Sequence, residues 1–382
     1  MYDYIIIGAG FAGSVLAHCL AQKKDVKILL IDQRSHIGGN CFDSMDQHNI
    51  LIHNYGPHLF HTDSIRVWQF LSQFTQWHNY HHKVEGFIDG QYVPIPFNLN
   101  TLHQLFPNYL ASSIEKKLIE HYGYGAKVTI LELQKTEDKE LQFIANFIYE
   151  KIFLHYSSKQ WGKKIEELDS FVSARVPIVI SKDDRYFHDR FQALPQEGYT
   201  KLFEKMLALP NIDIRLNTTF KTFLHLKDNH FTVNGEVYNG HIIFTGMIDE
   251  LYDFRFGQLP YRSMELIFEN HVLESFQNAT TTNYPNDYDY TRITEFKKMY
   301  NTKNETTTIA KEYPKTFSYG KNTPYYPIFT DENQKRYEAY RDYAKSFKNL
   351  TLIGRLAEYK YYDMDDIILR ALELYEEKFS DA

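Results

Sequence analysis

The chain has 382 residues, and at roughly 100–200 residues per domain this length predicts two or three domains. Apolar residues make up 43% and charged residues 24%, which is typical of a globular protein, and 42 basic against 49 acidic residues disfavour a nucleic-acid partner. Cys19 and Cys41 are too few for a disulfide scaffold and fit a cytoplasmic location, and no stretch approaches the roughly 18 apolar residues of a membrane span.

The first predicted elements form a strand–helix–strand unit. A short apolar run over Tyr4–Ile7 predicts a strand, residues 14–21 predict a helix, and Val26–Ile31 predicts a second buried strand. The turn before the helix reads Gly8-Ala9-Gly10-Phe11-Ala12-Gly13, and Asp32 follows the second strand. A G-x-G-x-x-G turn in this setting indicates a Rossmann-like nucleotide-cofactor site.

The spacing of these glycines has a chemical reason. Gly8 permits a tight turn, Gly10 lets a pyrophosphate approach the backbone, and Gly13 lets the helix pack closely on the strand. Asp32 can accept hydrogen bonds from a ribose. A second glycine-rich turn, His36-Ile37-Gly38-Gly39-Asn40, is not required by an NAD site and is typical of flavoproteins. The pattern therefore favours FAD over NAD.

Seven histidines fall within residues 48–82 and raise the question of a metal site. Acidic and cysteine ligands at suitable spacing are scarce there. The pair His58-x-x-His61 lacks the glutamate of a His-Glu-x-x-His zinc motif. We therefore predict no metal.

The rest of the chain alternates between helices and strands. Residues 284–326 carry eight of the 30 tyrosines, which suits either a surface that stacks ligand rings or tyrosines buried in a sheet, and both readings stay open. The elements predicted along the way are a helix over 62–74 with Thr62 or Asp63 as its N-cap, a strand pair that turns at Asp89-Gly90, helices over about 101–156, a hairpin turn at Asn234-Gly235 and a strand over His241–Phe244.

Five motifs carry a resemblance to a known family. They are G-A-G-F-A-G at 8–13, H-I-G-G-N at 36–40, Y-G-P-H-L-F-H-T at 55–62, K-Q-W-G at 159–162 and G-R-L-A-E-Y-K-Y-Y-D-M at 354–364. Together they resemble the prokaryotic UDP-galactopyranose mutases, from residue 2 to about 370.

The resemblance implies an FAD enzyme, a cytoplasmic homodimer, that interconverts UDP-galactopyranose and UDP-galactofuranose for surface glycans. It implies that the reduced flavin is the active form, with a reductant such as NAD(P)H. The flavin N5 would attack the anomeric carbon, release UDP and form a covalent flavin–sugar adduct, with no net redox change.

The implied fold class is α/β, or α+β overall: a Rossmann-like FAD-binding domain with a helical insertion and an antiparallel sheet layer. The domains we expect are a discontinuous FAD-binding domain over 1–80, 196–246 and 335–382, a helical domain over 98–165, and an antiparallel sheet substrate domain over 81–97, 166–195 and 247–334.

The same resemblance assigns residue roles. Arg175 and Arg292 would grip the diphosphate, because arginine offers planar, bidentate contacts to phosphate, and His61 would lie near the flavin and sugar. The cofactor-binding residues would be Gly8, Gly10, Ala12, Gly13, Asp32, Gln33, Gly39, Asn40, His58, Leu59, Phe220, Arg355, Tyr362, Asp363 and Met364. The substrate-binding residues would be His82, Tyr156, Ser157, Trp161, Arg175, Tyr186, Asn283, Arg292, Tyr326 and Tyr361.

Two positions depart from the common pattern of the family. Ser157 stands where threonine is commoner, and His82 stands where many relatives carry asparagine. Two other functions stay open. One is an FAD-dependent oxidoreductase of the amine-oxidase type on the same scaffold. The other is a non-enzyme that keeps the fold to bind a partner, as Rab-escort-type proteins do, although the retained arginines and tyrosines argue against it.

Overall fold

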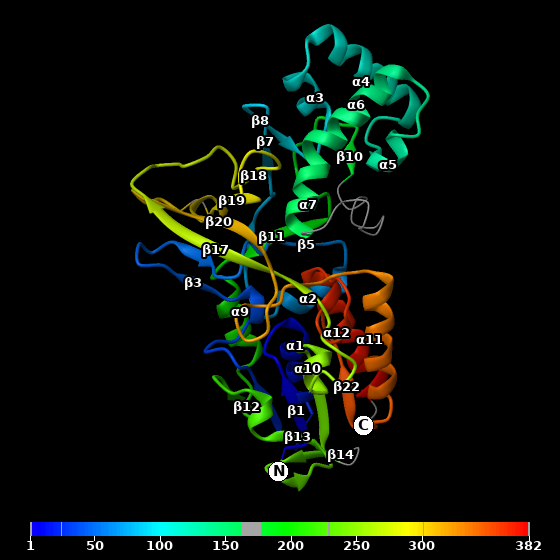
Figure 1. The fold of residues 1–382 in the computed structure, drawn as a ribbon. Coiled ribbons are helices and arrows are strands. Elements are labelled where there is room, and N and C mark those ends of the chain that lie inside the picture. Colours follow the sequence, from blue (N-terminus) through cyan, green and yellow to red (C-terminus); the bar gives the residue numbers. More distant parts are fainter. Residues whose placement is uncertain (1, 24, 162–176, 228–229, 301, 381–382) are drawn as a thin grey trace.

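The computed structural model describes residues 2–23, 25–161, 177–227, 230–300 and 302–380. Figure 1 shows a helical region at one end, a sheet with two long strands in the middle, and a parallel sheet with its helices at the other end. Chain segments far apart in sequence lie side by side in the last of these regions, where blue, green and red ribbons meet.

A five-stranded parallel sheet contains the predicted strand–helix–strand unit. Tyr4 pairs in register with Ile28 on one side and with His241 on the other. The central strands are apolar throughout because helices cover both faces of the sheet. The strands, in order across the sheet, are β12 (Ile212–Arg215), β2 (Ile28–Ile31), β1 (Tyr4–Ile7), β16 (His241–Phe244) and β22 (Leu350–Leu352).

Alternate residues of these strands pack into two cores, as the two-residue period of a strand requires. Ile6 faces one core and Ile5 the other. Helices on the first face are α1 (Phe11–Ala21), α2 (Ile65–Leu71), α9 (Tyr199–Met206) and α12 (Met364–Lys378). The second face carries α10 (Ile248–Leu251), α11 (Asp331–Ala344) and the small sheet of β13 (Leu224–Lys227), β14 (His230–Val233) and β15 (Glu236–Val237).

The predicted strands over Tyr4–Ile7 and His241–Phe244 are confirmed, as is the turn at Asn234-Gly235. The helix of the first unit begins at Phe11, three residues before its predicted start, because Gly10 is still extended and serves as the N-cap. The second strand begins at Ile28, two residues later than predicted.

A seven-stranded sheet forms the middle layer. Five of its six pairings are antiparallel, as expected for this layer, and one, β18 with β7, is parallel. The strand pair predicted to turn at Asp89-Gly90 is confirmed. The strands, in order, are β21 (Tyr326–Pro327), β17 (Tyr261–His271), β20 (Thr307–Thr316), β19 (Arg292–Glu295), β18 (Thr281–Asn283), β7 (Val84–Ile88) and β8 (Gln91–Ile95).

A three-stranded sheet of β5 (Phe60–Thr62), β11 (Phe191–Pro195) and β6 (Trp77–Asn79) adjoins the middle layer. It corrects the helix predicted over 62–74. Thr62 belongs to β5, where it pairs with Phe191, so neither Thr62 nor Asp63 caps the helix. Helix α2 instead begins after Ser64, whose side chain accepts a hydrogen bond from the backbone N–H of Val67.

The helical region predicted over about 101–156 is confirmed, with its own apolar core. A π-helical turn over Tyr149–Leu154 interrupts the last long helix, as such turns do at functional sites. The helices are α3 (Leu99–Leu105), α4 (Asn108–Tyr122), α5 (Ile130–Leu133), α6 (Lys139–Ile148) and α7 (His155–Trp161). No helix formed by the described residues is both long and apolar enough to cross a bilayer.

Candidate active site

A cavity of about 250 Å³ lies at the carboxyl ends of the central parallel strands, where open α/β sheets bind their ligands. Its wall includes the turn after β1, the end of β2, the Gly39-Asn40 turn and the segment that leads into α12. The predicted cofactor-binding residues on this wall are Gly8, Gly10, Ala12, Asp32, Gln33, Gly39, Asn40, His58, Phe220, Arg355, Tyr362, Asp363 and Met364.

The glycines of this cavity leave room that any side chain would fill. A Cβ atom on Gly39 would lie 2.9 Å from the Cα of Gly10, so the two glycine-rich turns touch each other. A Cβ on Gly8, whose φ is +105°, would overlap the side chain of Thr245. Helix α1 begins here without a side-chain cap or an acidic residue in its first turn, so its free N–H groups can bind phosphate.

Asp32, predicted to bind a ribose, also contacts the backbone of the two neighbouring turns. One carboxylate oxygen accepts a hydrogen bond from the backbone N–H of Ala9. The other accepts one from the backbone N–H of Arg34, and both bonds are 2.9 Å long. The carboxylate therefore also fixes the shape of the turn that would carry the pyrophosphate.

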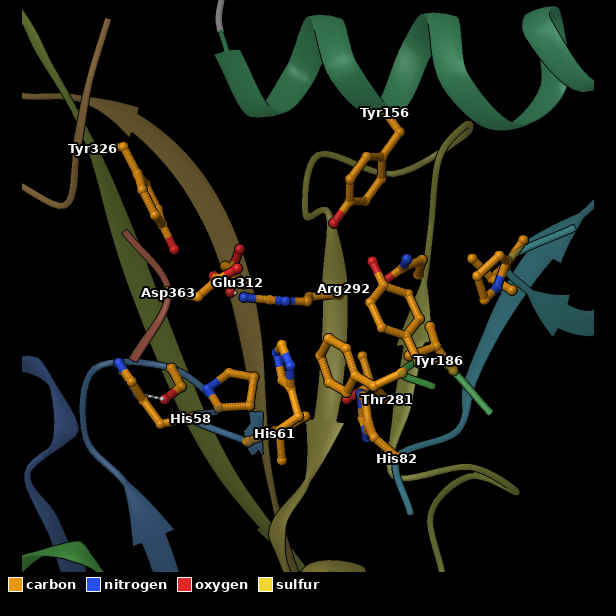
Figure 2. Close-up of a pocket in the computed structure, with 18 of the residues that line it drawn as sticks. His58, His61, His82, Tyr156, Tyr186, Thr281, Arg292, Glu312, Tyr326 and Asp363 are labelled. Carbon is orange, nitrogen blue, oxygen red and sulfur yellow. Dashed lines mark hydrogen bonds and ion pairs between the residues drawn. The ribbon is translucent and has the colours of Figure 1, made fainter. Parts of the chain in front are cut away.

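A second cavity, of about 510 Å³, lies between the middle sheet and α7. Figure 2 shows Arg292 at its centre, with Tyr156 pointing down from α7, His61 below, and Tyr186 and His82 to one side. The predicted residues on its wall are His58, Leu59, His61, His82, Tyr156, Ser157, Tyr186, Asn283, Arg292, Tyr326 and Tyr361. Leu59 was predicted to contact the cofactor and lies on this larger cavity instead.

The two cavities share part of their walls. The residues common to both are Asn40, His58, Tyr325, Arg355, Asp363 and Met364. A ligand in the larger cavity can therefore reach the end of a cofactor that extends along the smaller one.

Arg292 is held by a buried carboxylate. Its Nε donates to Oε2 of Glu312 at 2.7 Å, across the directly paired strands β19 and β20. The Glu312 side chain is only 4% exposed, so the pair has little competition from water. Burial lowers the pKa of Arg292, but the charge of Glu312 outweighs it and the pKa is raised. Because the contact uses Nε, the terminal guanidinium nitrogens can bind a phosphate.

A second cation, Arg355, lies against two aromatic rings. Its guanidinium carbon is 4.6 Å from the ring centre of Tyr326 and 5.2 Å from that of Tyr361. The Tyr361 hydroxyl donates to Asp363 at 2.9 Å. This stack brings a fixed positive charge and two tyrosines to the junction of the cavities.

The three histidines predicted for the site differ in charge. Burial lowers the pKa of His58 and of His82 to about 3, so both are neutral near pH 7. Burial also lowers the pKa of His61, but the hydrogen bond and charge of Asp189 outweigh it, and the pKa of His61 is raised. His61 is thus the histidine best placed to carry a proton.

Three predicted residues are not among the described residues that line either cavity: Gly13, Trp161 and Arg175. Gly13 lies beneath the smaller cavity, where a Cβ would meet the carbonyl oxygen of Gly8 at 2.0 Å, so its role is close packing. Trp161 ends α7, but its side chain is outside the described residues, and Arg175 lies outside them altogether. Within those residues, no three histidine, cysteine, aspartate or glutamate side chains gather as metal ligands.

The sequence reasoning missed several residues of the larger cavity, among them Phe187, Asp189, Glu312 and Tyr325. Glu312 gave no clear signal, since the same strand also carries the charged residues Lys311 and Lys315. Asp189 gave none.

The sequence left open whether the tyrosines of residues 284–326 line a ligand site or pack inside the sheet, and the structure shows both. Tyr325 and Tyr326 line the larger cavity. Tyr284, Tyr288 and Tyr290 pack mainly on one another, with ring centres 5.0–5.1 Å apart.

The fold and the paired cavities define a Rossmann-like dinucleotide-binding protein with a second, arginine-bearing cavity for a phosphorylated ligand. The family model of NAD(P)-binding Rossmann-like domains matches residues 6–74, and that of UDP-galactopyranose mutase matches residues 151–361, more than half of the chain. The chain belongs to the UDP-galactopyranose mutase family, and it is an enzyme that isomerises a nucleotide sugar.

Individual relatives agree with this assignment. The chain is 36% identical to the dTDP-fucopyranose mutase of Escherichia coli, over 98% of this chain and 97% of that protein. It is 35% identical to the probable UDP-galactopyranose mutase of Klebsiella pneumoniae, over 99% and 95%. A crystal structure of reduced UDP-galactopyranose mutase matches with a TM-score of 0.76 at 16% identity, covering 100% of this chain and 94% of that one, which shows a shared fold.

Proposed function

We propose that the chain interconverts UDP-galactopyranose and UDP-galactofuranose, with FAD in the smaller cavity and the nucleotide sugar in the larger one. The observation that carries the proposal is the shared wall of the two cavities, together with Arg292, which the buried Glu312 holds on the wall of the larger cavity. It allows a cofactor to meet a sugar whose diphosphate is held by arginine.

The smaller cavity suits FAD. The N–H groups at the start of α1 and the facing glycine turns would hold the pyrophosphate, and Asp32 would bind the adenosine ribose. Asn40, Arg355 and Met364, which reach both cavities, would border the flavin ring. When bound and reduced, FAD supplies the nucleophilic nitrogen that takes up the sugar while UDP is released.

The side chains of the larger cavity would manage the charge of the diphosphate. Negative charge on the phosphate rises as the bond to the sugar breaks, so a fixed guanidinium stabilises the transition state more than the ground state. Arg292 would supply this contact, with the hydroxyls of Tyr326 and Tyr361 beside it. Tyr156, Ser157, Tyr186 and Asn283 would bind the uridine and ribose.

The test is an anaerobic incubation of the reduced protein with UDP-galactofuranose, followed by chromatography of the nucleotide sugars. We expect UDP-galactopyranose to accumulate without net consumption of reductant. Stoichiometric reduction of the oxidised flavin by an amine, with no isomerisation by the reduced protein, would instead support the oxidoreductase of the amine-oxidase type, which the family assignment makes the less supported alternative.

A second candidate substrate is dTDP-fucopyranose, because a 36% identical relative is a dTDP-fucopyranose mutase. One end of the larger cavity is apolar, with Val84, Ile95, Ile152 and Phe153 on its wall, and such a surface suits the methyl group of thymine. Parallel assays with both nucleotide sugars, compared by kcat/KM, decide between them. A higher value for the dTDP-sugar would replace UDP-galactose as the proposed substrate.

We further propose that the reaction takes place in the cytoplasm, which the free thiols of Cys19 and Cys41 support. NAD(P)H would reduce the flavin, and the protein would act as a homodimer. The product would be used for surface glycans.

A further inference from the structure

Asp189 lies in the segment that precedes β11 and belongs to none of the sequence motifs. Its Oδ2 is 3.2 Å from Nδ1 of His61, and both residues line the larger cavity. The side chains are 25% and 17% exposed, so the contact is partly shielded from water. This is an ion-pair distance, and among the described residues Nδ1 has no hydrogen-bond partner of good geometry. Because a carboxylate can only accept, a hydrogen bond between the two side chains requires the proton on Nδ1.

The ring of His61 is fixed on a second side as well. The ring of Phe187 stacks on it, with centres 3.7 Å apart and planes 19° apart. Strand pairing holds both partners in place, since β5 and β11 are in register with His61 opposite Gln192. Phe187 and Asp189 therefore reach His61 from one short segment.

The charges around His61 favour a cation at this position. Besides Asp189, the carboxylates of Asp363 and Asp365 at the start of α12 raise the pKa of His61. His82, ahead of β7, also faces it, and burial keeps His82 neutral. His188 and Lys127 lie on the same cavity wall and act on Asp189: the charge of Lys127 helps to lower the pKa of Asp189, while burial lowers that of His188. In return, the hydrogen bond with His61 lowers the pKa of Asp189, so that Asp189 is ionised near pH 7.

We propose that Asp189 is a positioning residue for the reaction. Its carboxylate keeps the proton of His61 on Nδ1 and holds the ring flat against Phe187, so that Nε2 is the nitrogen available to the cavity. The effect on turnover rests on the proposed function, whereas the effect on His61 itself does not.

The primary experiment follows the titration of His61 by NMR in ¹⁵N-histidine-labelled, FAD-loaded protein, with the signal assigned through His61→Asn. In Asp189→Asn the amide can still accept from Nδ1, but the negative charge is gone. We expect the midpoint of His61 to move to lower pH in this variant and to return toward the wild-type value in Asp189→Glu. An unchanged midpoint in Asp189→Asn overturns the proposal.

Turnover supplies the second readout. We expect Asp189→Asn to lower kcat by about ten- to a hundred-fold, the equivalent of one charge-assisted hydrogen bond, with KM nearly unchanged. If protonated His61 is the active form, activity is lost as pH rises through its pKa, so the loss occurs at lower pH in the variant. Absence of isomerase activity in the wild type contradicts the proposed function but leaves the NMR result decisive for Asp189.

Asp183 offers the matched control. It is 30% exposed on the same connecting segment and pairs with Arg185 at 2.6 Å; it does not itself line the cavity, although its Oδ2 lies 3.7 Å from Nε2 of His188, which does. We expect Asp183→Asn to leave the titration of His61 and the pH profile unchanged. Equal shifts in Asp183→Asn and Asp189→Asn would mean that both variants merely loosen the segment, and would overturn the proposal.

Discussion

Arg292 combines burial with a single fixed partner. Glu312 holds its Nε, so the guanidinium is oriented before any ligand arrives. Such preorganised donors contribute most when charge develops on the group they face.

The first prediction follows from this arrangement. We expect Arg292→Ala to lower turnover by about 10²–10³-fold while the flavin stays bound, because the residue lines the larger cavity only. Arg292→Lys should recover part of the loss, since an ammonium cannot make the bidentate contact. The measurement is turnover of each reduced variant beside its flavin absorbance spectrum. Loss of activity explained wholly by loss of FAD would remove Arg292 from the reaction.

The second prediction contrasts two glycines of the same turn. A Cβ on Gly13 would meet the backbone oxygen of Gly8 at 2.0 Å, whereas one on Gly10 has its nearest neighbour at 3.8 Å. We expect Gly13→Ala to destabilise the fold by about 1–3 kcal/mol, as overpacking does. Gly10→Ala should leave the apoprotein stable but weaken FAD binding, because the methyl group enters the cofactor cavity. Thermal melting and flavin titration separate the two effects, and equal melting temperatures would contradict the packing argument.

The side chain of Lys159 ties helix α7 to the middle sheet. The ammonium of Lys159 donates to the backbone carbonyl oxygens of Tyr284, Asn286 and Tyr288, at 2.7–2.9 Å. These carbonyls lie in the connection between β18 and β19, which carry Asn283 and Arg292. Lys159 therefore sets the distance between the two sides of the larger cavity.

The third prediction is that Lys159→Met raises KM for the nucleotide sugar by about ten-fold, since each hydrogen bond from a charged group contributes about 1.5–3 kcal/mol. We expect a smaller effect on kcat, because Lys159 does not line the cavity. Lys151→Met is the control, as Lys151 pairs with Asp89 on the exposed surface. Similar KM values for Lys159→Met and Lys151→Met would show that the hydrogen bonds of Lys159 do not shape the site.

Local signals predicted the elements whose contacts are local. The glycine turn, the strand over Tyr4–Ile7 and the hairpin at Asp89-Gly90 all follow from short-range spacing. The start of α2 was placed wrongly because Thr62 pairs with a strand almost 130 residues away. Glu312 was missed for the same kind of reason, since only the register of β19 and β20 brings it to Arg292.

At the scale of the whole molecule, the two cavities share a wall and form one continuous site. The fourth prediction concerns its redox state. We expect protein with oxidised flavin to be nearly inactive and dithionite-reduced protein to turn over many times without consuming electrons, because oxidised flavin is an electrophile rather than a nucleophile. Activity is measured anaerobically in both states, and equal turnover would rule out flavin nucleophilicity.

The parallel sheet has a consequence for how the protein is made. Its edge strand β22 comes from residues 350–352, and α12, which packs on α1, comes later still. Arg355 and Met364, on the wall of the cofactor cavity, follow β22 as well. Until residues 350–364 have been synthesised, the glycine turn at residues 8–13 exists but the wall of its cavity is incomplete. Cofactor capture by this cavity therefore has to wait for the segment that runs from β22 into α12, and we expect a chain that stops before β22 to lack it.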